Sequence, residues 1–115
     1  IRRWLTPRAT VHYATVPPRV HGTPSHWDAI QQEVRRMATS GQYSDIFVNR
    51  SISTATSGQV QSALRPDIIA RTVHGTYVIV EVVSPSQTYI QLQNKMQMMI
   101  QVLGPLFGGG RIIHP

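Results

Sequence analysis

The segment from Tyr77 to Val83 is apolar at every position except Glu81. A strand that is apolar on both faces belongs in the middle of a sheet that is covered on each side. A carboxylate buried there without a partner costs several kcal/mol, so Glu81 requires a bound cation, a cationic side chain or a proton. This segment therefore predicts a covered sheet with a compensated acid at its centre.

The rest of the chain predicts an α/β (α+β) domain with an α-β-β-β-α-β core, in which helices flank a mixed sheet. Residues 1–24 are rich in Arg and Pro and form an N-terminal arm, in which Val11, Tyr13 and Val16 can add an edge strand. Residues 25–115 form a single domain. The expected elements are a helix over about 26–39, strands over 43–49, 67–73 and 76–83, a helix over about 87–103 and a short strand over 111–113.

Local signals set the bounds of these elements. Ser25 and Asp28 resemble a capping pair, and Gly41 ends the first helix. The second helix has an apolar stripe from Tyr89 to Leu103, and the last strand follows a helical crossover, which predicts that it lies parallel to its neighbour. The long stretch 50–64 and the glycines at 108–110 are expected to be loops. The stripe on the second helix consists of Tyr89, Leu92, Met96, Met99 and Leu103.

The strand before Glu81 begins with a second acid, Asp67. In a hairpin, directly opposed residues share a constant sum of residue numbers. A two-residue turn at His74-Gly75 would place Asp67 opposite Val82, with Glu81 facing the other side of the sheet. A three-residue connection with Gly75 as a left-handed bulge places Asp67 opposite Glu81, with the two Cβ atoms roughly 5 Å apart. We therefore predict an odd-length connection, and a Mg²⁺ or Mn²⁺ ion shared by the two acids.

The chain has a single lysine, Lys95, among 11 basic and 5 acidic residues. On the second helix it projects from the border of the apolar stripe, so its ammonium can reach the two acids. It can serve as the amine of an active site, or it can form an ion pair with Glu81 without any chemistry. The net charge of +6 suits a polyanionic partner such as nucleic acid, although a basic surface also serves solubility.

These residues resemble the PD-(D/E)xK nuclease superfamily over about residues 26–113. The match is carried by Pro66-Asp67 at the start of one strand and by Glu81 in the next. The resemblance implies a restriction-endonuclease-like fold and a metal-dependent endonuclease. It also implies that Glu33, on the first helix, is a supporting ligand beside Asp67 and Glu81.

A closer resemblance is to C-terminal toxin domains of bacterial polymorphic toxins, of the contact-dependent inhibition and Rhs types. It implies a domain of a larger secreted or surface-delivered protein that acts in the cytoplasm of a target cell, and a cognate immunity protein as partner. The first residue is Ile1, which fits a fragment of a longer chain. DNA is slightly preferred to tRNA as substrate. The matching segments are 37–50, 65–68 and 80–87.

One position departs from the superfamily pattern, because Val83 stands where a lysine is expected two residues after Glu81. In one interpretation Lys95 supplies the amine, and Ser84 or Gln87 positions water or phosphate. In the other, the domain is a degraded nuclease that only binds nucleic acid or protein. Ser84 and Ser86 can also be no more than caps of the second helix.

The remaining polar residues suggest contacts and alternatives. There is no cysteine, and the histidines lack a paired metal spacing, which makes Zn²⁺ a less favoured metal. Most histidines are expected at the surface, with His26 able to contact phosphate at the start of the first helix. A metal-independent RNase needs an imidazole brought close to a second imidazole or a carboxylate. No segment is long and apolar enough to suggest a membrane span. The arginines expected to contact nucleic acid are Arg36, Arg50, Arg65 and Arg71.

Overall fold

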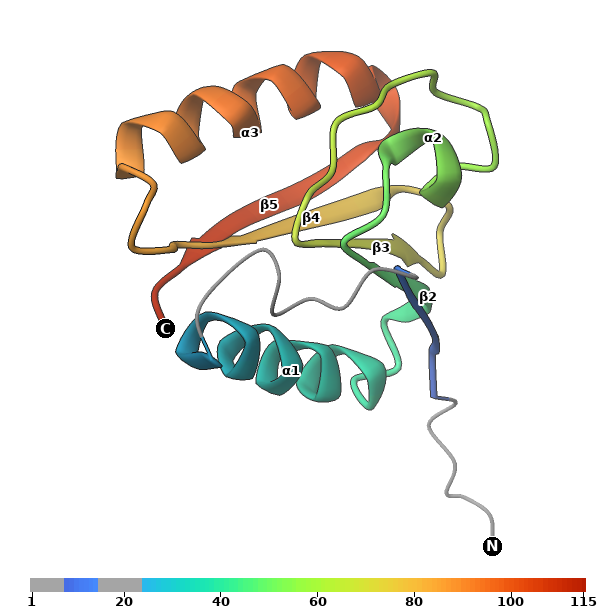
Figure 1. Ribbon diagram of the computed structural model, residues 1–115. Coiled ribbons are helices and arrows are strands. Elements are labelled where there is room, and N and C mark those ends of the chain that lie inside the picture. The colour runs from blue at the N-terminus through green and yellow to red at the C-terminus, as the bar shows by residue number, and fades with distance from the viewer. Residues whose placement is uncertain (1–7, 15–23) are drawn as a thin grey trace, which may run out of the picture.

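The computed structural model describes residues 8–14 and 24–115, which form a five-stranded mixed sheet between helices (Figure 1). The strands lie in the order β1-β2-β3-β4-β5. The two end pairs, β1–β2 and β4–β5, are parallel, and the two inner pairs are antiparallel. The elements are β1 (Thr10–Tyr13), α1 (Pro24–Ala38), β2 (Tyr43–Val48), α2 (Ile52–Ala55), β3 (Ile68–Thr72), β4 (Tyr77–Val82), α3 (Tyr89–Leu103), the 3-10 helix η2 (Gly104–Leu106) and β5 (Phe107–Ile113).

The sheet separates two apolar cores, one under α1 and one under α2 and α3 (Figure 1). Val80 and Val82 of β4 belong to the core under α1, whereas Tyr77 and Ile79 belong to the other core. This alternation is the burial on both faces that the apolar run in β4 predicts. The predicted fold class is confirmed, as are the parallel pairing of β5 and the edge strand through Val11 and Tyr13. Val16 lies outside the described residues.

The connection between β3 and β4 has the predicted odd length. Thr72 N donates to Thr76 O at 2.8 Å, which leaves three residues, 73–75, in the turn. Gly75 has φ 89°, in the left-handed region that a bulge of this kind requires. Ile68 pairs with Val80, so one further step of the register places Asp67 opposite Glu81.

Four expectations about local structure are wrong. The helix α1 begins at Pro24, so Ser25 and Asp28 lie inside it and are not its cap. Residues 50–64 contain α2, whose buried Ile52 and Ala55 are too few to form a recognisable period. Tyr89 is 48% exposed at the first turn of α3 and is not part of its buried stripe. The glycines at 108–110 lie in a strand and not in a loop.

The glycines at 108–110 were expected to form a loop, but they lie within β5. At Gly108 an added Cβ would come within 2.6 Å of Thr76 Oγ1, and at Gly110 within 2.9 Å of Met96 Sδ. Close packing of β5 against β4 therefore favours glycine at 108, whereas at 110 the flexible Met96 side chain on α3 can move aside.

Candidate metal centre between β3 and β4

Asp67 and Glu81 hold together the point where β3 and β4 separate. Asp67 N donates to Glu81 Oε2 at 2.6 Å, and Val82 N donates to Asp67 Oδ2 at 2.7 Å. Each carboxylate thus accepts from an N–H group of the opposite segment, just beyond the last paired residues of the ladder. The sequence prediction that the two acids converge is confirmed by this geometry.

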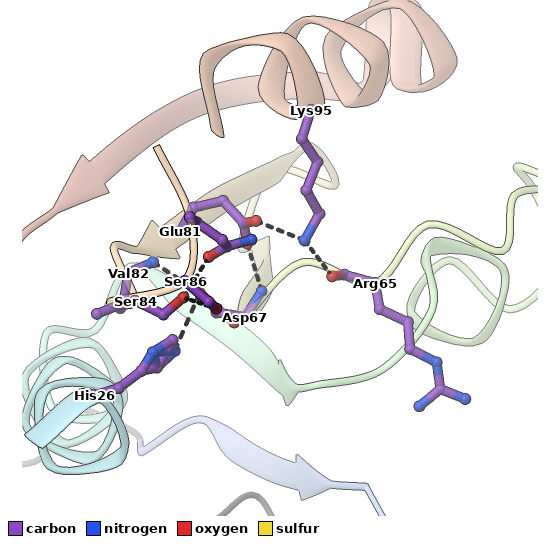
Figure 2. A network of polar contacts seen from close by, with 9 residues as sticks. His26, Arg65, Asp67, Glu81, Val82, Ser84, Ser86 and Lys95 are labelled. Atoms are coloured by element: carbon purple, nitrogen blue, oxygen red, sulfur yellow. Dashed lines mark hydrogen bonds and ion pairs between the residues drawn. The ribbon is translucent and has the colours of Figure 1, made fainter. Parts of the chain in front are cut away.

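Lys95 reaches this point from α3. Its Nζ lies 2.6 Å from Glu81 Oε1 and donates to Arg65 O at 2.8 Å. The Glu81 side chain is only 1% exposed, whereas that of Lys95 is 26% exposed. The lysine therefore contacts solvent as well as the buried acid. Figure 2 shows the lysine descending from the helix to the acid. The border position on α3 that the sequence indicated therefore does bring the amine to Glu81.

The two acids are incompletely compensated. Burial raises the pKa of Glu81, and the charge of Asp67 raises it further; the ion pair with Lys95 lowers it, but by less. Burial also raises the pKa of Asp67, against the lowering effects of the hydrogen bond from Val82 and the charge of Lys95. One ammonium does not offset two neighbouring carboxylates removed from water. The pair is a place where additional positive charge would be stabilised.

His26 joins the site from α1, on the opposite face of the sheet, which sequence reasoning missed (Figure 2). Its side chain is 7% exposed, and Nε2 lies 3.7 Å from Asp67 Oδ2. Burial lowers the pKa of His26, against the raising effect of Glu81, so the imidazole is neutral at pH 7. The contact with Asp67 is therefore polar and not an ion pair. His26 is therefore buried and not at the surface, and no local signal in the sequence indicates its approach to Asp67.

Glu33 does not join Asp67 and Glu81 as the resemblance implied. Glu33 is a buried residue of α1. Arg36 forms a bidentate ion pair with it, and Arg111 Nη2 lies 2.5 Å from Glu33 Oε2. Burial raises the pKa of Glu33, but the two arginines lower it by more, so this acid is compensated by protein groups. Glu33 thus ties α1 to β5, and a supporting role in metal binding finds no support in its position.

Ser84 and Gln87 form a small network directly after β4. Ser84 Oγ donates to Gln87 Oε1 at 3.0 Å and lies 3.3 Å from Ser86 Oγ. Neither serine caps α3, because Thr88 is the N-cap and forms a capping box with Gln91. The alternative that Ser84 and Ser86 serve only as helix caps is therefore wrong. Figure 2 shows Ser84 and Ser86 near the acids.

The four arginines predicted to contact nucleic acid do not lie along one track. Arg36 is held by Glu33 on the α1 side of the sheet. Arg50 donates to Tyr13 O at 2.9 Å, and Arg65 donates to Asn49 O at 3.4 Å. Arg71 Nη1 lies 3.9 Å from Asp45 Oδ2. Of the four, Arg65 is the one adjacent to the candidate centre, since its own carbonyl binds Lys95.

The donor set fits a hard divalent cation. Within residues 8–14 and 24–115, no three His, Cys, Asp or Glu side chains are close enough to form a complete cage. Mg²⁺ commonly binds through one or two carboxylates and keeps several waters, so a pair of acids suffices. Burial raises the pKa of both carboxyl groups, so a bound cation would stabilise their ionised forms. Asp67 and Glu81 are the residues that would hold the ion, and Mn²⁺ would be held in the same way.

No helix in the described part of the chain is long and apolar enough to cross a membrane. Comparisons with models of known families, with characterised proteins and with solved structures gave no match to this chain.

Proposed function

We propose that this protein is a divalent-metal-dependent endonuclease that hydrolyses phosphodiester bonds at Asp67 and Glu81. The observation that supports this most strongly is the pairing of two buried acids at the end of the β3–β4 ladder, with Lys95 bound to one of them, Glu81. A fold with no use for this cluster would gain stability from apolar residues at these positions. Three ionisable groups gathered at a largely buried point support a chemical role.

Each residue has a distinct task in this proposal. A bound Mg²⁺ or Mn²⁺ would supply Lewis-acid polarisation of a phosphate oxygen and a nucleophile of lowered pKa. Asp67 and Glu81 would hold the cation, and the backbone N–H groups that bind them keep both carboxylates in place. Lys95 exchanges its contact with Glu81 for a phosphate oxygen or the attacking water. Ser84 and Gln87 offer hydroxyl and amide groups beside the site to orient that water.

The biological setting is proposed from the resemblance to polymorphic toxins. In that setting the domain is delivered as part of a larger protein, acts in the cytoplasm of a target bacterium and is neutralised by an immunity protein in the producing cell. DNA and tRNA are both candidate substrates. The basic net charge of +6 favours either polyanion.

The test is cleavage of plasmid DNA and of tRNA with Mg²⁺, Mn²⁺ or EDTA, using variants of matched shape. Asp67→Asn and Glu81→Gln are expected to lose cleavage by at least ~10³-fold, because they remove the metal ligands but retain the hydrogen-bond acceptors. Asp28→Asn changes an exposed acid on α1 by the same chemistry and is expected to cleave as the wild type does. If the Asp67→Asn, Glu81→Gln double variant still cut, the proposal would be wrong.

A second candidate function is a binding module of nuclease-like fold. The close Lys95–Glu81 ion pair favours it, because that pair partly compensates Glu81 without any metal. Lys95→Gln separates the two. An active-site amine predicts a loss of about 10²-fold or more in kcat, with little change in the affinity for nucleic acid. A binding module predicts no turnover in either protein. Gln101→Ala, at an exposed position on the same helix, controls for changes to α3.

A further inference from the structure

A second polar cluster lies in a hollow of about 580 Å³ on the same face of the sheet as Glu81 and Lys95. The hollow belongs to that face because Phe47 packs in the core with Ile79, which is two residues before Glu81. It opens beside α2, toward the other end of β3. From Asp67 to Arg71 is four residues, or about 13 Å along the strand. Its lining includes His12, Asp45, Phe47, Arg71 and Tyr77.

The first feature of the hollow is an aromatic platform. The His12 ring stacks on the Phe47 ring, with centroids 4.5 Å apart and planes 12° from parallel. The two residues are register partners on β1 and β2, so the backbone holds the rings in this arrangement. The Tyr77 ring also borders the hollow, but it is 3% exposed and belongs to the core, so the platform consists of His12 and Phe47. Flat aromatic surfaces of this kind are what an unstacked nucleobase binds.

The second feature is a carboxylate whose charge is retained. Asp45 Oδ1 accepts from His12 Nε2 at 3.0 Å, and Oδ2 lies 3.9 Å from Arg71 Nη1. Burial raises the pKa of Asp45, but the hydrogen bond from His12 and the charge of Arg71 contribute to a larger lowering. Asp45 is therefore ionised at neutral pH. It repels a phosphate group but accepts hydrogen bonds from the amino or imino groups of a base.

The third feature is the mixture of donors and acceptors around the platform. Arg71 only donates, Asp45 only accepts, and Gln59, Thr54 and Ser57 do both. A site for phosphate alone would need donors only. A volume of about 580 Å³ lies within the range of small-molecule pockets and has room for a base with its sugar. Shape, stacking surface and hydrogen-bonding groups all match one kind of ligand.

We propose that this hollow binds an unpaired nucleobase of the substrate strand, and that the substrate is therefore a single-stranded or looped nucleic acid. The proposal rests on the proposed nuclease function and names its substrate class. In a duplex the Watson–Crick edges and faces of the bases are covered, so only an unpaired or flipped base can enter. The apolar core under α2 and α3 covers the sheet between the two sites, so a strand passes over α2 to place one base in the hollow and a phosphate near Asp67 and Glu81.

The experiment measures binding of short labelled RNA and DNA single strands, and of the corresponding duplexes, by fluorescence anisotropy in EDTA. Arg71→Ala and Arg35→Ala each remove one positive charge, but Arg35 is exposed on α1, on the other face of the sheet. Both variants lower the net charge of the protein by one, so both weaken the long-range attraction to nucleic acid to a similar extent. Arg71→Ala also loses a contact to the base. Its affinity for single strands is therefore expected to fall about ten-fold further than that of Arg35→Ala.

Asp45→Asn supplies a second, isosteric variant. It replaces an acceptor-only group by one that also donates, so it is expected to change the order of affinities among the four homopolymers. Its unfolding midpoint shows whether the fold is intact, and Arg71→Ala, at a half-exposed position, tests the hollow should Asp45→Asn not fold. The RNA and DNA arms show which sugar the site accepts.

Equal weakening by Arg71→Ala and Arg35→Ala, with an unchanged base preference in Asp45→Asn, would overturn the proposal. Duplexes that bind as tightly as single strands would also overturn it. Neither result bears on metal-dependent cleavage, because binding is measured in EDTA. Failure of the proposed nuclease function is instead recognised by the absence of turnover with Mg²⁺ or Mn²⁺ on every substrate. The two failures are therefore distinguishable.

Discussion

Asp67 is held as a carboxylate in a place that favours its neutral form, and this has a measurable consequence. Burial raises its pKa, so the ionised acid lowers the free energy of unfolding at neutral pH. Asn at this position still accepts from Val82 N and has no charge. We expect Asp67→Asn to raise the free energy of unfolding at pH 7 by on the order of 1 kcal/mol, or a Tm by about 4 °C, while it loses cleavage.

Thermal and urea unfolding of Asp67→Asn, wild type and the exposed-acid variant Asp28→Asn measure this effect. Asp28→Asn is expected to leave stability unchanged. Stability and activity would then change in opposite directions at a single residue, as expected where a charge is retained for function. An Asp67→Asn variant less stable than the wild type would show that the ionised acid is fully compensated by the protein.

The same residue predicts a dependence on pH. The pKa of Asp67 in the folded state lies above its ordinary value of 3.8. At pH values between these two pKa values, the folded state binds more protons than the unfolded state. The stability of the wild type relative to Asp67→Asn therefore decreases as pH rises through the folded pKa and becomes constant above it. Denaturant titrations from about pH 4 to pH 8 measure this difference. A difference that does not change with pH would contradict it.

The effect of His26 on the pH dependence of stability is opposite to that of Asp67. Its folded pKa lies below 6.5, so the unfolded state binds the additional proton as pH falls below that value. The contribution of a neutral His26 to stability is present above this range and is lost on acidification. His26→Gln, which cannot be protonated, is expected to reduce the loss of stability below about pH 6.5. The measurement is the free energy of unfolding of the wild type and of His26→Gln as a function of pH, and the slopes of the two curves are compared.

Among the elements, the β3–β4 hairpin determines which side chains meet. The three-residue connection gives the register that places Asp67 opposite Glu81, and it depends on the positive φ of Gly75. We expect Gly75→Ala to lower the free energy of unfolding by about 1–2 kcal/mol, because a Cβ disfavours the left-handed conformation. No atom lies within 4 Å of the added Cβ, so the cost is conformational and not a clash.

Urea denaturation tests this expectation, with His74→Ala in the same turn as control. His74 is exposed, and its replacement is expected to change stability by less than about 0.5 kcal/mol. Gly75→Ala is expected to cleave at temperatures where it is folded, as long as the register is kept. A Gly75→Ala variant as stable as the wild type would show that the turn does not require the left-handed residue.

At the scale of the whole molecule, the proposed cation couples the site to global stability. A ligand that binds only the folded state stabilises it by about 2.7 kcal/mol at a hundred times its Kd. We expect Mg²⁺ or Mn²⁺ to raise the Tm of the wild type and to leave that of Asp67→Asn, Glu81→Gln unchanged. Differential scanning fluorimetry with and without EDTA measures this shift. Equal shifts in the two proteins would place the bound metal elsewhere.

The local pattern of the sequence determined the order of the elements apart from α2 and η2, the position of β4 inside the sheet and the approach of Lys95 to Glu81. These features follow from periodicities within single elements and from the length of one turn, which act between residues close in the chain. The convergence of Asp67 and Glu81 was predictable for the same reason, because a hairpin register is a matter of counting residues.

Only the tertiary structure decided which distant side chains meet. His26 lies beside Asp67, Glu33 is paired with Arg111, and His12 binds Asp45, each across elements far apart in the sequence. Such contacts depend on how a helix or an edge strand is placed on a face of the sheet, which is set by the packing of the two cores and not by any local period. The same packing buries Ile52 in the stretch 50–64, where the sequence indicated only a loop.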